Sequence, residues 1–207
     1  RHMHDYGTTE EQIASVAVKN HANGVHNPYA QYQKAISIDE VMQSGYIASP
    51  LKLLDCSPIT DGASEVILCS SEKAKQYCKE PIEIIASAQA SDTIALAERA
   101  SLTKIHATEV AAHEAYKQAK ISAKDVDVTE VHDCFTIAEI MAIEDLGFFK
   151  KGTGGKATAD GETALDSKKP INTSGGLKAK GHPVGATGIA QAIEIVQQLQ
   201  NRAGAAV

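Results

Sequence analysis

The pattern of apolar and polar positions predicts a chain in which helices alternate with strands. One example is the apolar face formed by Ile189, Ala192, Ile193, Val196 and Leu199, which repeats with a helical period. A helix ending near residue 21 should begin with a capping box, formed by Thr8 or Thr9 with Glu11 or Gln12. Helices are expected over 9–21, from Ser37 onward, and over 71–78, 108–119, 137–146 and 189–199.

Short runs rich in β-branched residues separate these helices and predict strands. The expected strands cover 47–54, 63–70, 82–90 and 126–131, with a further extended lead-in at 169–172. Residues 150–162 have the Gly- and Lys-rich composition of a mobile loop, and Pro81 is the best candidate for a domain boundary. The alternation predicts an α/β layered fold divided into residues 1–80 and 81–207.

Composition narrows the class of protein. A net charge of −6 and a pI near 5.7 argue against a protein that binds nucleic acid or an anionic membrane. The sequence has no apolar run long enough for a membrane span, and its four cysteines form no C-x-x-C pair. We therefore expect reduced thiols and a cytoplasmic location.

A glycine-rich segment at 172–188 holds one titratable ring, His182. The segment does not match a P-loop, because His-Pro follows Gly181 where Lys and Ser or Thr would bind phosphate and magnesium. It also fails the dinucleotide fingerprint, because Gly181, Gly185 and Gly188 are spaced G-x₃-G-x₂-G. The segment is either a structural turn with a solvated histidine or a loop that presents His182 to a ligand.

A second group of reactive side chains follows the predicted strand 126–131. His132 and Cys134 stand at its carboxyl end, where sites form in α/β sheets. A thiol beside imidazoles can act as a nucleophile or as an acid and base, or it can be an inert buried cysteine. Four other histidines cluster near the start of the chain, but without Cys or carboxylate at ligand spacing they are expected to be surface residues. They are His2, His4, His21 and His26.

Three blocks in this order resemble the thiolase superfamily. They are residues 53–63, the Val-His-Asp-Cys-Phe block at 131–135, and the Gly-His-Pro loop at 174–188, with Tyr-Gly-Thr-Thr at 6–9 as further support. The His-Asp-Cys-Phe block is most similar to sterol-carrier-protein-type thiolases and archaeal acetyl-CoA acetyltransferases. The resemblance implies a thiolase-like α/β fold made of the second thiolase half and part of the loop domain.

The resemblance also implies a reaction. Thiolases join two acyl-CoA molecules by Claisen condensation or cleave 3-ketoacyl-CoA with CoA. His182 would activate the nucleophile and polarise the thioester carbonyl, and His132 would stabilise the enolate oxygen directly or through a water. Cys134 would move the α-proton or only line the pocket.

Further expectations follow from the same resemblance. Ser57, Gly181 and Gly185 would contribute to CoA binding, with CoA thioesters as substrates and no metal or other cofactor. The full-length protein would form a homo-oligomer, and a partner protein of an acetoacetyl-CoA pathway could bind it.

The sequence also departs from the family pattern. No block matches the acyl-accepting cysteine of thiolases, and their last Cys-x-Gly loop has no counterpart. We therefore expect a fragment of a longer enzyme that is inactive alone. Two alternatives are a non-catalytic acyl-CoA- or lipid-binding subunit and an unrelated hydrolase with Cys134 as its nucleophile.

Overall fold

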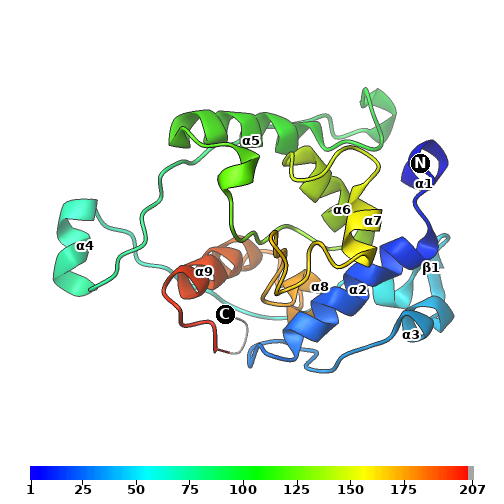
Figure 1. Cartoon of the computed structure of the whole chain (residues 1–207), viewed down its shortest axis with the longest axis horizontal. Helices are drawn as coiled ribbons and strands as arrows, with labels where there is room; N and C mark the ends of the chain where they lie inside the picture. Colours follow the sequence, from blue (N-terminus) through cyan, green and yellow to red (C-terminus); the bar gives the residue numbers. More distant parts are fainter. Residues whose placement is uncertain (205–207) are drawn as a thin grey trace.

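The computed structural model describes residues 1–204. The helices are α1 (His2–Tyr6), α2 (Glu10–Gly24), α3 (Ile38–Gln43), α4 (Ser71–Tyr77), α5 (His106–Ala119), α6 (Thr136–Asp145), α7 (Gly154–Ala159), α8 (Gly176–Lys180) and α9 (Thr187–Leu199). The strands are β1 (Tyr46–Ala48) and β2 (Leu51–Lys52), and short 3₁₀ turns cover Leu53–Asp55, Leu96–Glu98 and Ala123–Asp125. In Figure 1, α3, α6, α7 and α8 lie around α2 while α4 lies apart.

The helices predicted from periodicity and capping are confirmed. The Thr9 hydroxyl accepts the Gln12 amide at 3.2 Å, and the Gln12 side chain accepts the Thr9 amide at 3.2 Å. A second capping box, between Ser37 and Glu40, begins α3. These contacts join residues only three positions apart, which is why the sequence alone could predict them.

The structure confirms the predicted strands only in part. The strand predicted over 47–54 is a short antiparallel hairpin of β1 and β2, and the strand predicted over 126–131 makes a single parallel bridge, Thr129 to Ile171. Within residues 1–204, the segments 63–70 and 82–90 belong to no ladder, so those two predictions are wrong. Their β-branched residues favour an extended backbone, but a strand also needs a neighbour to accept its hydrogen bonds.

The prediction of a mobile loop over 150–162 is wrong, because this region contains α7. The amide of Gly154 donates to the Glu144 carboxylate at 2.9 Å, and α7 packs against α2. Tertiary contacts therefore order a segment whose composition is typical of a loop.

The core lies on two sides of α2. Ile13 and Val16 pack with Ile140 of α6, whereas Ala14 and Ala17 of the same helix pack with Val41 of α3. A third cluster, formed by Val131, Ala142, Ile143 and Ile171, lies between α6 and the segments on either side of the Thr129–Ile171 bridge. The division of the chain at residue 80 stays a prediction.

No helix among residues 1–204 combines the length and the apolar character needed to cross a bilayer.

Candidate functional site

Two extended segments that are distant in the sequence bring the predicted site residues together. The amide of Asn172 donates to the Thr129 carbonyl at 2.8 Å, and the Thr129 amide donates to the Pro170 carbonyl at 3.2 Å. The buried Asn172 side chain extends this contact, because its Oδ1 accepts the Val131 amide at 2.8 Å. The segment leading to His132 is thereby held against the start of the Gly-His-Pro loop.

The rings of His132 and His182 meet edge to face, with their centroids 4.7 Å apart and an interplanar angle of 84°. His182 Nδ1 lies 2.8 Å from the Thr187 hydroxyl, which donates its own hydrogen to the Pro183 carbonyl at 3.1 Å. Because this hydroxyl has only one hydrogen, it accepts from His182 Nδ1–H. In the neutral ring this leaves the lone pair on Nε2, where a proton can be accepted.

The surroundings of His132 favour its neutral form. The ring of His132 is partly exposed to solvent. Its partial burial, and then the nearby His182, lower the pKa of His132 below its ordinary 6.5. At neutral pH His132 is therefore a neutral N–H donor, which suits an oxygen that gains negative charge during a reaction.

Cys134 lies beside the loop that carries Ser57. The Ser57 amide donates to the Cys134 carbonyl at 2.9 Å, and Cys56 bridges to Phe135. Partial burial is the main factor that raises the pKa of the Cys134 thiol, and burial also raises the pKa of the Cys56 thiol. Both residues therefore hold their protons at neutral pH, which argues against Cys134 as the nucleophile of an unrelated hydrolase.

The remaining predicted residues shape the other side of the loop. Gly181 has φ +99°, and a Cβ placed there would lie 2.2 Å from the Thr60 hydroxyl. Gly185 is exposed and lines an open cleft of about 430 Å³ between residues 60–64 and 183–186. Ser57 lies near Cys134, while Gly181 and Gly185 lie toward this cleft.

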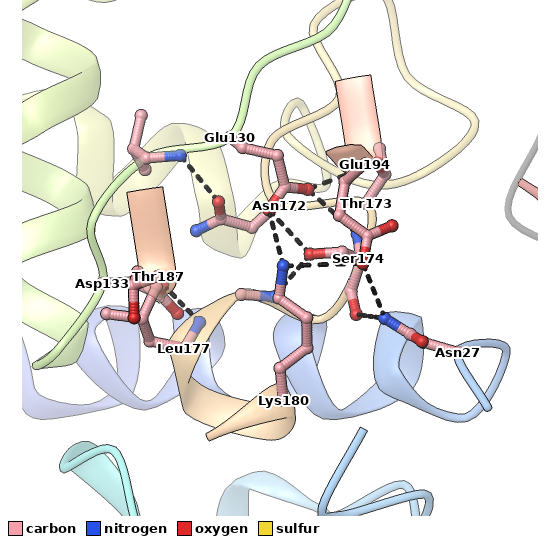
Figure 2. Close-up of polar contacts among 12 residues, drawn as sticks. Asn27, Glu130, Asp133, Asn172, Thr173, Ser174, Leu177, Lys180, Thr187 and Glu194 are labelled. Carbon is pink, nitrogen blue, oxygen red and sulfur yellow. Dashed lines mark hydrogen bonds and ion pairs between the residues drawn. The ribbon is translucent and has the colours of Figure 1, made fainter. Parts of the chain in front are cut away.

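A network of buried polar side chains beneath the loop was missed by the sequence analysis. Glu130 accepts both the amide and the hydroxyl of Ser174, at 3.1 and 2.6 Å, and Lys180 lies 3.5 Å from Glu130 and 3.7 Å from Glu194. Figure 2 shows the side chains of Glu130 and Lys180 meeting beside Ser174. Asn27 donates to the Ser174 carbonyl at 2.9 Å. Glu130 precedes His132 by two positions, but no local signal in the sequence pairs it with residues 174 and 180.

The prediction that the clustered histidines lie on the surface is wrong for two of them. His2 and His21 are buried rather than on the surface. His2 contacts the Thr8 hydroxyl at 2.8 Å and Glu144 at 3.2 Å, and His21 stacks on Tyr32. In the part of the chain that the structure describes, no group of three or more His, Cys, Asp or Glu residues could hold a metal ion.

Comparison with known proteins adds three findings. Residues 88–207 match the family model described as Thiolase C-terminal domain-like. The acetyl-CoA acetyltransferase of Methanothermobacter thermautotrophicus is 55% identical over 204 residues, covering 99% of this chain and 53% of that relative. Sterol carrier protein 2 of Bos taurus is 40% identical over 208 residues, covering 98% of this chain and 38% of that relative.

A solved structure agrees with these relatives. The Ltp2-ChsH2(DUF35) aldolase matches with a TM-score of 0.87 at 29% identity, covering 99% of this chain and 55% of that one. The chain therefore spans about half the length of its archaeal relative and of this structural neighbour.

Proposed function

Because the chain belongs to the thiolase family, we propose that it forms the part of an acyl-CoA thiolase that carries the two catalytic histidines. Both the resemblance and the thiolase-like α/β fold predicted from the sequence are confirmed by these relatives and by the solved neighbour. The observation that carries the proposal is the edge-to-face contact of His132 and His182, with His182 Nε2 free to accept a proton.

The proposed reaction is the Claisen condensation of two acyl-CoA molecules, or its reverse. In the acyl-transfer step, His182 Nε2 accepts the proton of a cysteine thiol, whose sulfur then attacks the thioester carbonyl carbon. The carbon–sulfur bond to CoA breaks, and the CoA thiolate takes up the proton held by His182. The neutral His132 donates an N–H hydrogen bond to the thioester oxygen when it carries enolate charge.

Cys134 fits a second proton-transfer role. When a 3-ketoacyl-CoA is cleaved, the bond between C2 and C3 breaks and leaves an enolate that must gain a proton at its α-carbon. A thiol whose pKa is raised by partial burial keeps its proton at neutral pH and can donate it there. Cys134 is therefore proposed as this acid. The condensation is the reverse of this step and starts from the Cys134 thiolate, which takes up the α-proton.

The attacking cysteine is proposed to come from the part that the longer relatives carry in addition to the segment matched here. The partly buried thiols of Cys56 and Cys134 have raised pKa values, and Cys69 and Cys78 are exposed and lie outside the site. On this proposal the 207-residue chain alone lacks turnover.

CoA is proposed to bind along the cleft beside the Gly-His-Pro loop. The cleft runs between residues 60–64 and 183–186, where Gly185 leaves the backbone open to a ligand. Gly181 allows the loop to approach Thr60, and the Ser57 amide donates to the Cys134 carbonyl. The proposed substrates are CoA thioesters, and no further cofactor is needed. The full-length protein is proposed to be a cytoplasmic homo-oligomer, which a partner protein of an acetoacetyl-CoA pathway would bind.

The test replaces the corresponding segment of the Methanothermobacter acetyl-CoA acetyltransferase with this chain and measures cleavage of acetoacetyl-CoA by CoA. We expect turnover, and we expect His182→Ala to lower kcat by about 10² to 10⁴ because a proton acceptor is lost. His26→Ala, at an exposed position, is the matched control.

Equal activity of the His182→Ala and parent chimeras would refute the proposal. An NMR titration of the 207-residue chain with acetyl-CoA measures CoA binding independently of turnover. CoA binding without turnover in a folded chimera would favour the alternative, a non-catalytic thiolase-fold subunit that binds acyl-CoA or lipid.

A further inference from the structure

Asp133 lies between His132 and Cys134 in the chain, but its side chain is fully buried. Its Oδ1 accepts the Leu177 amide at 2.7 Å, and its Oδ2 accepts the Lys178 amide at 3.2 Å. These are amides of the first turn of α8, which have no acceptor within their own helix. Figure 2 shows Asp133 beside Leu177 at this end of α8.

The backbone of α8 is shaped around this carboxylate. Gly176 has φ +58°, and a Cβ there would lie 2.3 Å from Asp133 Oδ2 and 2.7 Å from its Cγ. No side chain other than hydrogen fits at position 176 while Asp133 keeps its place. Two residues that are 43 positions apart, from 133 to 176, are therefore fitted to one another in space.

The far end of the same turn leads directly to His182. The amide of Gly181 donates to the Leu177 carbonyl at 3.0 Å, so Leu177 is held by Asp133 through its N–H and holds Gly181 through its C=O. One helical turn thus connects the Asp133 carboxylate to the residue before His182. At its other side, Asp133 is covalently joined to His132.

We propose that Asp133 is a positioning residue that sets the distance and angle between His132 and His182 by holding the first turn of α8. The catalytic meaning of this geometry rests on the proposed function, whereas the geometry itself does not. A contact that fixes two catalytic groups at reacting distance contributes to rate even though it never touches substrate.

The charges around Asp133 define what a substitution changes. Asn20 of α2 donates its Nδ2 hydrogens to Asp133 Oδ2 at 2.7 Å and to Glu139 Oε2 of α6 at 2.8 Å. Lys19 pairs with Glu139 at 2.6 Å. Lys178 is a second buried cation near Asp133, so two buried cations face two buried carboxylates. Burial and the charge of Glu139 raise the pKa of Asp133 to about 7, while the amides of α8 and the charge of Lys19 act in the opposite direction.

An isosteric change disrupts the contacts at one carboxylate oxygen with little change in volume. Asp133→Asn keeps one acceptor but points an NH₂ group at donors, because both Oδ2 partners, Lys178 N–H and Asn20 Nδ2, are themselves donors. The matched control is Asp145→Asn at the end of α6. Asp145 is also buried and accepts a backbone amide, from Ile105 at 2.7 Å, but it belongs to neither loop.

The experiment follows both imidazoles by NMR in the histidine-labelled 207-residue chain, at a pH where Asp133 is ionised. In folded Asp133→Asn, we expect loss of the cross-relaxation between the rings of His132 and His182. We also expect the signals of both rings to shift at this pH. Asp145→Asn should lower the melting temperature and leave both ring signals unchanged.

Unchanged ring contact and unchanged ring signals in a folded Asp133→Asn chain would overturn the proposal, as would equal changes in Asp145→Asn. Gly176→Ala provides a second route to the same displacement if Asp133→Asn does not fold, because its methyl group would push the carboxylate away. The readout needs no turnover. A chain that passes this test but fails the thiolysis assay would refute only the proposed function.

Discussion

The region around α2 and the segment 56–102 contain similar apolar residues but bury them to different extents. In α2, the apolar residues Ile13 and Val16 are 4% and 0% exposed. No residue of the segment 56–102 is buried, and Ile67 and Ile94 are 89% and 98% exposed. In Figure 1 this segment runs as an extended chain, with α4 lying apart from the other helices. An apolar, β-branched sequence is therefore not sufficient for a strand, because burial and backbone pairing both require a partner.

The same difference appears at the starts of α2 and α4. Both helices follow a hydroxyl residue, Thr9 and Ser70. The Thr9 side chain completes a capping box, whereas the Ser70 side chain makes no capping hydrogen bond. Local sequence supplies the cap residue in both cases, but only α2 is also held in place by packing on α3, α6, α7 and α8.

The sharpest test of this contrast compares two isoleucines. Ile140→Ala, at a fully buried position next to α2, should lower the free energy of unfolding by about 2 to 5 kcal/mol, because it loses apolar burial and leaves a cavity. Ile67→Ala, at an exposed position, should change it by less than about 0.5 kcal/mol. Urea denaturation followed by circular dichroism measures both variants. A loss above about 1 kcal/mol for Ile67→Ala would mean that the segment 56–102 packs in solution.

A smaller effect is expected at the helix caps. Thr9→Ala removes the acceptor of the Gln12 amide and should cost about 1 kcal/mol. Ser70→Ala should be neutral, because its side chain accepts no amide of α4. The same denaturation curves decide the matter, and equal losses in the two variants would break the comparison between the helices.

The smallest effect concerns pH. Burial lowers the pKa of His21 in the folded chain below its ordinary 6.5. Between these two pKa values His21 is protonated in the unfolded chain but remains neutral in the folded chain. This site therefore stabilises the fold above pH 6.5, and the contribution is lost as the pH falls toward the folded pKa. We expect His21→Gln to lose less stability than the parent between about pH 7.5 and about pH 5.5.

The control for this prediction is His113→Gln, at an exposed ring of α5. It should follow the parent at both pH values. The prediction fails if His21→Gln and the parent lose equal stability on acidification.

The part of the site that the sequence predicted consists of motifs in which chemistry and spacing are local. His132 and His182 were assigned from two such blocks, and the structure places their rings in contact. Their catalytic roles stay predictions. Asp133 stood in the same block as His132, but its meaning depends on Asn20, Glu139 and the first turn of α8, which only folding brings together.

By itself, the sequence determined α2, α3, α4, α5, α6 and α9, the capping boxes and the family, because each depends on residue types within a few positions or on the order of short blocks. Tertiary structure alone decided which extended segments pair, that His2 and His21 are buried, and that residues 154–159 form a helix. The physical reason is that hydrogen-bond partners and burial are properties of neighbours in space. A run of β-branched residues or a histidine carries no record of which distant segment will cover it.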